Sequence, residues 1–254
     1  MASEAKLAIV NPQLAGGNPK RRVRSWPNAT WVEEELQQLA NGLKEGNTVA
    51  EVGIGAGSYA RSLSIPAAVR VTVDLPVQSV SRPWQWPVAD DSVDLLISVD
   101  ALHYETDVEA FVREAARVTR TTRLFAFVAR SRENLQHDGL AKFFPEAVNR
   151  ALPLVTEIPV LEKMLEKQGL YCAKRVVLEG QLQIDEVLLR AIAHRELTGL
   201  ATLSEEEFAK GVDDMKVAIG KGEAAWASKF TMLVCRKVRP WKSDSGPASG
   251  TGMI

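Results

Sequence analysis

The pattern of hydrophobic positions changes repeatedly along the chain, from helical spacing to short continuous runs. Apolar side chains recur at intervals of three and four over residues 30–43, which predicts a first helix. Short apolar runs that predict buried strands follow, at residues 48–52, 69–73, 95–99 and 124–129. A short helix over 58–63 and a longer one over 107–118 are predicted between them. Strands that alternate with helices indicate an α/β fold with a mainly parallel sheet.

The second half of the chain continues this alternation. Its predicted elements are a helix near 160–168, a strand at 171–178, helices at 185–197 and 205–219, and a final strand at 230–235. Capping-box spacing, a Ser or Thr followed three residues later by Glu, marks three helix starts, at Thr30, Thr106 and Ser204. We expect one domain over residues 25–238, between a flexible segment at 1–24 and a disordered tail at 239–254.

Composition and charge narrow the range of functions. The 254 residues are 46% hydrophobic and 25% charged, and the net charge of −1 argues against broad electrostatic binding of nucleic acid or a membrane surface. The apolar runs are too short to span a bilayer, and the first residues show no signal-peptide core. Cys172 and Cys235 lack the spacing of a metal site, so we expect no metal and two buried thiols in the reducing cytoplasm.

The most informative segment is a glycine-rich turn after the first predicted strand, with Gly53, Gly55 and Gly57. Glycines between a strand and a helix let the backbone turn sharply and approach a ligand at the helix N-terminus. Asp74 ends the next strand, where a carboxylate can accept both hydroxyls of a ribose. Glu51 lies two residues before the first glycine, a position from which it can hold an ammonium group. The pattern favours an aminoacyl nucleoside over a dinucleotide, because Ser58 occupies the third small position of the dinucleotide motif.

This Glu-x-Gly-x-Gly-x-Gly pattern, followed by Asp74, resembles the S-adenosylmethionine loop of class I methyltransferases. It is most similar to their small-molecule branch, often called type 11. Segments 86–96 and 114–118 resemble the stretches around the fourth strand and the next helix of that family. The resemblance covers residues 22–130 well and continues weakly to 236. It implies a Rossmann-like, doubly wound sheet with an antiparallel last strand, and a substrate cap over residues 185–219.

The resemblance also implies roles for single residues. The methionine part of S-adenosylmethionine would lie over the three glycines, with Glu51 near its amino group and Asp74 on the ribose. The resemblance has Ser98 facing the sulfonium. The acidic residue that usually meets the adenine amino group falls near Arg82 here, so Trp84 and Trp86 are the candidates to cover the adenine instead. The acceptor side has a candidate base, His103, and four candidate binding residues, Asp100, Tyr104, Arg190 and His194. The protein needs mainly to align the reactants, because the sulfonium is a built-in leaving group.

One departure from the family pattern lies after Asp74. Only twelve residues, 75–86, separate Asp74 from Pro87 of the next matching segment, too few for the helix and third strand that the family has there. We therefore expect the third strand or its helix to be reduced. Three alternatives to a small-molecule methyltransferase stay open: an inactive methyltransferase-like binding protein, an enzyme that uses the sulfonium without transferring methyl, and an NAD oxidoreductase. The acceptor and the oligomeric state are open as well.

Overall fold

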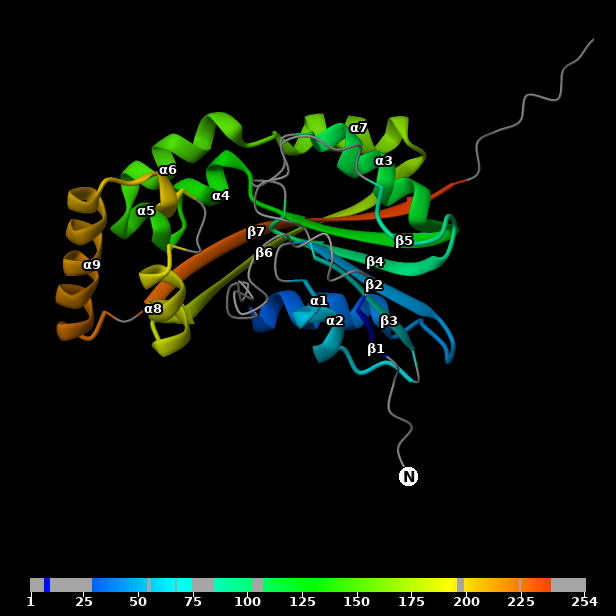
Figure 1. Ribbon diagram of the computed structural model, residues 1–254, viewed down its shortest axis with the longest axis horizontal. Coiled ribbons are helices and arrows are strands. Elements are labelled where there is room, and N and C mark those ends of the chain that lie inside the picture. The colour runs from blue at the N-terminus through cyan, green and yellow to red at the C-terminus, as the bar shows by residue number, and fades with distance from the viewer. Residues whose placement is uncertain are drawn as a thin grey trace, which may run out of the picture.

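A mainly parallel sheet forms the centre of the computed structural model (Figure 1). The structure describes residues 7–9, 29–53, 56–66, 68–74, 85–101, 107–195, 199–223 and 225–238. Within these residues seven strands pair in the order β1-β3-β2-β4-β5-β7-β6. They are β1 (Leu7–Ile9), β2 (Thr48–Gly53), β3 (Val69–Asp74), β4 (Val93–Val99), β5 (Thr119–Ala129), β6 (Leu170–Gln183) and β7 (Ala225–Lys237). The pairs from β1 to β5 are parallel and β7 is antiparallel to its neighbours, which confirms the predicted fold class.

Helices cover both faces of this sheet, as a doubly wound fold requires (Figure 1). On one face lie α1 (Thr30–Ala40) and α2 (Ser58–Ser62), and on the other lie α3 (Val108–Val118) and α7 (Ile158–Lys167). The central strands are buried on both sides: Leu95 of β4 packs in the cluster under α1, and Leu96 packs in the cluster under α3. Strands covered on both faces have continuous apolar runs, which is why the sequence predicted their positions well.

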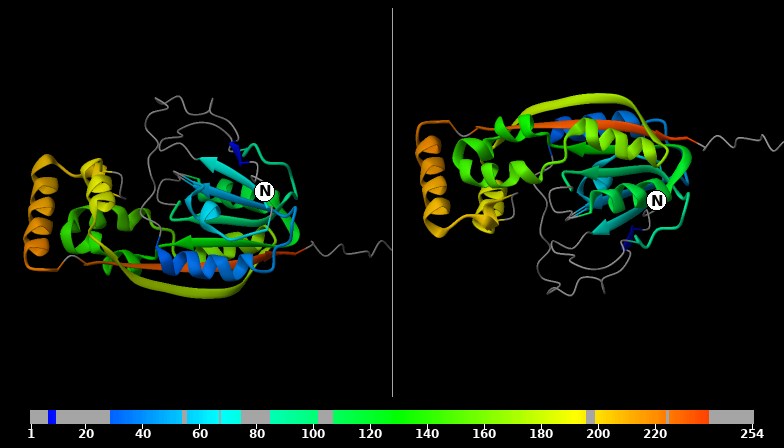
Figure 2. Two further views of the ribbon diagram at one scale, coloured as in Figure 1. Left: turned by 90° about the horizontal axis from the view of Figure 1, so that it is seen from below. Right: turned by 90° about the horizontal axis from the view of Figure 1, so that it is seen from above.

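A further group of helices lies beyond the carboxyl ends of the parallel strands, where β6 and β7 extend to meet it (Figures 1 and 2). We call this group the cap. Its helices are α4 (Arg132–Gln136), α5 (Gly139–Phe143), α6 (Pro145–Ala151), α8 (Glu186–Ala193) and α9 (Glu205–Gly220), with 3-10 turns at Leu152–Leu154 and Leu200–Thr202. Their apolar side chains pack around Trp226 of β7. The cap contains the region predicted at 185–219 and adds short helices between 132 and 151 that the sequence analysis did not predict.

The helix starts agree only in part with the predicted capping boxes. Ser204 caps α9 in the predicted box. α1 begins after Ala29 without a side-chain cap, so Thr30 lies inside its first turn and the box predicted there is wrong. Asp107 caps α3, so the box predicted for Thr106 is wrong too. Local spacing alone therefore identifies the helices but not always their first residue.

The strand at the sheet edge beside β3 comes from the N-terminal segment that was predicted to be flexible. β1 pairs in parallel with β3, and Ile9 lies opposite Thr72. The third strand was predicted to be reduced within residues 75–86, of which 75–84 lie outside the described residues. The edge next to β3 is thus filled by residues that precede the first helix.

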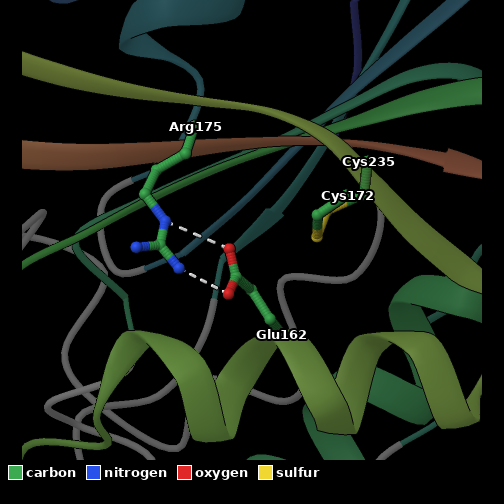
Figure 3. The surroundings of a disulfide bond; sticks show 4 residues. All are labelled: Glu162, Cys172, Arg175 and Cys235. Atoms are coloured by element: carbon green, nitrogen blue, oxygen red, sulfur yellow. Dashed lines mark hydrogen bonds and ion pairs between the residues drawn. A yellow bond between two sulfur atoms is a disulfide. The ribbon is translucent and has the colours of Figure 1, made fainter.

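The two cysteines form a disulfide, which contradicts the prediction of two buried thiols (Figure 3). Cys172 of β6 and Cys235 of β7 are partners across these antiparallel strands, although 63 residues separate them in the chain. On the same strand as Cys172, Arg175 donates to both carboxylate oxygens of Glu162 on α7, at 3.1 and 2.5 Å. Disulfides persist in oxidising compartments, so the pairing removes the ground for predicting a cytoplasmic location.

Candidate cofactor and acceptor site

The glycine-rich turn joins the end of β2 to the start of α2 at the carboxyl edge of the sheet. Gly55 lies outside the described residues. A Cβ on Gly53 would lie 3.5 Å from the Cβ of Ala101, so the turn abuts the residues that follow β4. Gly57 has a φ of +107°, and a Cβ there would lie 2.9 Å from Oγ1 of Thr72 on β3. Glycine alone meets this backbone angle and this close approach without strain, so the shape of the turn depends on it.

Glu51 lies on β2 just before this turn and is buried. Its Oε2 accepts a hydrogen bond at 2.7 Å from the amide of Ala60, in the first turn of α2. Burial raises the pKa of this carboxyl, while the backbone N–H groups of Ala60 and Gly57 and the charge of Arg61 act in the opposite direction. The carboxylate thereby pairs with N–H groups that a helix start leaves without partners, and it braces the turn. Its contact with an amino group of the ligand stays a prediction.

Asp74 and Trp86 are the residues predicted to hold the nucleoside. Asp74 ends β3 opposite Gly53, so its backbone lies beside the turn. The side chain of Asp74 lies outside the described part of the structure, and so does the whole of Trp84. Trp86 is 3% exposed and packs edge-on against Phe111 of α3, with ring centroids 5.2 Å apart. The structure thus places Trp86 in the core, and its contact with adenine stays a prediction.

The end of β4 carries two further predicted residues, Ser98 and Asp100. Ser98 is fully buried, and its hydroxyl has no hydrogen-bond partner within the described part of the chain. Asp100 follows the strand with a φ of +52° and donates its N–H to the carbonyl of Val128 on β5. This residue precedes Ala101, and so lies next to the glycine-rich turn. The other two residues predicted for this region, His103 and Tyr104, lie outside the described residues.

The structure adds a residue that the sequence analysis missed, Arg130, directly after β5. Its Nη2 lies 2.5 Å from Oδ2 of Asp100, and its Nη1 lies 3.6 Å from Oδ2 of Asp138. The guanidinium also lies over the ring of Phe230, 5.1 Å from the centroid. A charged residue at the end of an apolar strand run is the signal in the sequence that could have identified it.

Asp138 is the second residue that the sequence analysis missed. It precedes α5 and accepts hydrogen bonds from the amide of Leu140, the indole of Trp226 and the hydroxyl of Ser228. Burial raises the pKa of its carboxyl, and the charge of Arg130 lowers it. These contacts connect the cap to β7 and to the end of β5. An Asp followed by Gly at a helix start is common in loops, so the sequence alone gave little reason to single it out.

Acidic side chains gather near the start of α2. Burial raises the pKa of the Tyr59 hydroxyl, and the nearby charges of Glu51, Glu33 and Asp100 raise it further. The amide of Ala29 donates a hydrogen bond to the hydroxyl oxygen and lowers this pKa. Two of these carboxylates also have cations beside them: Arg130 pairs with Asp100 at 2.5 Å, and the charge of Arg61 acts on Glu51.

Arg190 and His194, the acceptor residues predicted on the cap, lie at the surface of the protein. Both side chains are exposed, because α8 turns Leu188 and Ile192 toward the cap core. The structure brings neither of them to Asp100 or Arg130 through a described hydrogen bond or ion pair. Their contact with an acceptor stays a prediction.

Comparison with known proteins agrees with this geometry. A family model described as a methyltransferase domain matches residues 50–127, from β2 into β5. The match includes the glycine-rich turn, the end of β3 and the turn after β4. Over residues 50–127 the chain therefore matches a methyltransferase domain, and this segment contains the residues predicted to hold S-adenosylmethionine.

Solved structures share the fold of this methyltransferase domain and of the surrounding chain. A putative methyltransferase from an antibiotic biosynthesis pathway of Anabaena variabilis ATCC 29413 is 17% identical, with a TM-score of 0.59 over 84% of this chain and 99% of its own. A putative methyltransferase from Bacillus halodurans C-125 is 18% identical, with a TM-score of 0.50 over 82% of this chain and 99% of its own.

A third structure with this fold is phosphoethanolamine N-methyltransferase 2 of Haemonchus contortus, solved with phosphomonomethylethanolamine and S-adenosylhomocysteine. It is 16% identical, with a TM-score of 0.50 over 82% of this chain and 52% of its own. No curated protein sequence matches the chain. Within the described ranges, none of the helices combines the length and hydrophobicity that a bilayer crossing requires.

Proposed function

We propose that this protein transfers a methyl group from S-adenosylmethionine to a small-molecule acceptor. The observation that carries the proposal is the junction between the glycine-rich turn and the end of β4, where Gly53 abuts Ala101. A donor over the turn and an acceptor beside Asp100 would then share one edge of the sheet. Ligands of open α/β sheets bind at this edge, beyond the carboxyl ends of the strands.

The charges at this edge fit S-adenosylmethionine better than a dinucleotide. Glu51 and Asp100 lie on either side of the turn, and both add to the negative potential at Tyr59. The sulfonium and ammonium groups of S-adenosylmethionine are cations, whereas the pyrophosphate of NAD carries negative charge that these carboxylates would repel. Asp74, at the end of β3 on the same edge, is the candidate partner for the ribose hydroxyls.

When bound, S-adenosylmethionine supplies a methyl group on a positively charged sulfur, which leaves readily as a thioether. The residues of this chain orient the reactants and keep water away from them. Glu51 braces the turn on the donor side through its hydrogen bond to Ala60. On the acceptor side, Arg130 holds the carboxylate of Asp100 at 2.5 Å.

The cap supports a small-molecule acceptor. Its helices follow β5 and β6 and lie at the same edge as the glycine-rich turn (Figure 1). Helices in this position would cover a small compound bound at the edge and would obstruct a long polymer. The net charge of −1 also gives no general attraction for nucleic acid. Arg190 of α8 and His194, directly after α8, are the candidate cap residues for contact with the acceptor.

Binding of S-adenosylhomocysteine, measured by calorimetry and by thermal unfolding, tests this proposal. We expect affinity on the order of micromolar and a rise in melting temperature by mass action, with no response to NAD. A response to NAD alone would support the oxidoreductase alternative. A folded protein that binds none of these nucleosides would be a methyltransferase-like binding protein. Breakdown of S-adenosylmethionine without a methylated product would favour other chemistry at the sulfonium.

A further inference from the structure

The strand β6 forms the outer edge of the sheet beside β7. It has fourteen residues and pairs with β7 alone, and both views of Figure 2 show it along the margin of the molecule, where it bows outward. Within the described residues, the main-chain groups of 174–182 make no hydrogen bond outside the β6–β7 pair. An outer strand directs the N–H and C=O of every second residue away from its sheet, so this edge can accept another strand.

The devices that usually protect an outer strand do not cover this stretch. Such devices are β-bulges and charged side chains that lie across the edge. The register of β6 against β7 shifts near the start of the strand and is regular from Lys174 onward. Lys174 pairs with Glu35 of α1, and Arg175 pairs with Glu162 of α7, so helices hold both cations (Figure 3).

Three side chains along this edge form a charge pattern. Arg175, Val177 and Glu179 alternate with residues that face α1, so all three lie on the face of the sheet that α7 covers. Val177 is 56% exposed, and the side chain of Glu179 is 71% exposed. Arg175 donates to Glu162 through Nε and Nη2, which leaves its Nη1 for another acceptor. A basic, an apolar and an acidic side chain thus follow one another on one face of the edge.

We propose that β6 pairs with β6 of a second copy of this chain, antiparallel and across a two-fold axis at Val177. Each residue then lies opposite the residue that is equally far from Val177 on the other side. Arg175 of each copy faces Glu179 of the other, and the two Val177 side chains meet on the axis. The pattern is therefore complementary to itself, as a two-fold interface requires.

The charges select this register over its neighbours. An axis at residue 175 or 179 would place two arginines or two glutamates directly opposite each other, and like charges in that position destabilise a strand pair. An axis at 176 or 178 would place Val177 opposite a charged side chain. Only the axis at Val177, among these five, pairs both charges with their opposites and also joins the two exposed valines.

The joined sheet leaves each copy with its own cofactor site. The two-fold axis is perpendicular to the sheet, so the parallel strands of the two copies run in opposite directions. Their glycine-rich turns then lie at opposite edges of the joined sheet, and the inference does not depend on the proposed function. One strand pair buries little surface, so we expect a dissociation constant on the order of 10 µM.

Sedimentation velocity of the full chain between about 1 and about 200 µM tests the proposal. We expect the mass to rise from that of one chain to that of two. Val177→Asp places two carboxylates on the axis and should weaken the dimer at least about tenfold. Val217→Asp is the matched control, because Val217 of α9 is also 56% exposed and lies away from β6. It should associate like the wild-type protein.

Two charge reversals test the register itself. Glu179→Arg gives a chain with two arginines along this edge, and Arg175→Glu gives a chain with two glutamates. We expect each variant alone to associate at least about tenfold more weakly than the wild-type protein. In an equimolar mixture the arginines of one chain face the glutamates of the other, so the dimer should return. Mixing cannot restore a chain that has failed to fold, so this recovery reports on the interface.

Three results would each overturn the proposal. The first is a wild-type protein that stays monomeric over the whole concentration range. The second is a dimer that persists unweakened in Val177→Asp, because the chains would then associate through another surface. The third is a mixture of the two charge reversals that associates no better than either variant alone.

Discussion

The parallel half of the molecule and the cap build their parts of the site by different means. In the parallel half, Glu51 braces the glycine-rich turn through the amide of Ala60, nine residues along the chain. In the cap, Asp138 accepts hydrogen bonds from the side chains of Trp226 and Ser228, which are 88 and 90 residues away in the chain. The donor side is thus built locally, and the acceptor side depends on contacts that only the complete fold supplies. A locally built donor side suits a methyl donor that many enzymes share. An acceptor side built from distant contacts suits an acceptor that differs from one enzyme to the next.

Gly57→Val is expected to have the largest effect, and to act on the donor side. The added side chain would need a φ near +107° and would meet Thr72 at 2.9 Å. We expect a cost of about 3 kcal/mol at the turn and affinity for S-adenosylhomocysteine weakened at least about a hundredfold, measured by calorimetry. Gly42→Ala, in the same half with open space around an added Cβ, is the control. Near-normal affinity in a folded Gly57→Val protein would mean that the turn does not hold the ligand.

Gly211→Ala should affect the cap and spare the donor side. A Cβ on Gly211 of α9 would lie 2.3 Å from the ring of Phe144, so the cap must shift to accept it. We expect the free energy of unfolding to fall by about 1 to 3 kcal/mol in urea titrations, with the affinity for S-adenosylhomocysteine unchanged. Gly220→Ala on the same helix meets nothing within 4 Å and should be close to neutral. A parallel loss of ligand affinity in Gly211→Ala would argue against two separable halves.

The same contrast decides what the sequence could predict. Gly53, Gly57 and Asp74 form a pattern within 22 residues, and the apolar runs around them belong to strands buried on both faces. The short helices α4, α5 and α6 have five to seven residues, too few for a clear helical period. Arg130 pairs with Asp100 after β4, and Asp138 accepts hydrogen bonds from side chains of β7. Local residue spacing carries no information on contacts between segments so far apart in the chain.

Two further features also depend on contacts between distant segments. β1 is three residues long and is defined by its pairing with β3, more than 60 residues later, so no local period identifies it. The disulfide likewise follows from the register of β6 against β7, which places Cys172 opposite Cys235. Features formed by neighbouring residues could thus be predicted from the sequence, whereas features formed where strands from distant segments pair could not.

Glu51→Gln tests the buried carboxyl on the donor side through the pH dependence of stability. Because burial raises the pKa of Glu51 above 4.5, the folded protein binds this proton more tightly than the unfolded chain does. This contribution is complete below pH 4.5 and is lost as the pH rises through the pKa of the folded state. The stability of the wild-type protein should therefore fall relative to that of Glu51→Gln as the pH rises above 4.5 in urea titrations. Parallel curves would show that the carboxyl is not desolvated.

Arg175→Ala should have the smallest effect, because its pair with Glu162 lies outside both halves of the site. The two side chains are 49% and 24% exposed, so water and salt screen their attraction. We expect a loss of about 0.5 kcal/mol in the free energy of unfolding, reduced further in high salt, and no change in ligand affinity. A loss as large as that of Gly211→Ala would mean that α7 depends on this pair.

A crystal structure of the protein with S-adenosylhomocysteine tests the central claim most directly. We expect the homocysteine part of the ligand to lie against the turn between Gly53 and Gly57, the ribose beside Asp74, and the sulfur facing Asp100. A ligand bound away from the carboxyl edge, or an edge left empty at saturating ligand, would contradict it.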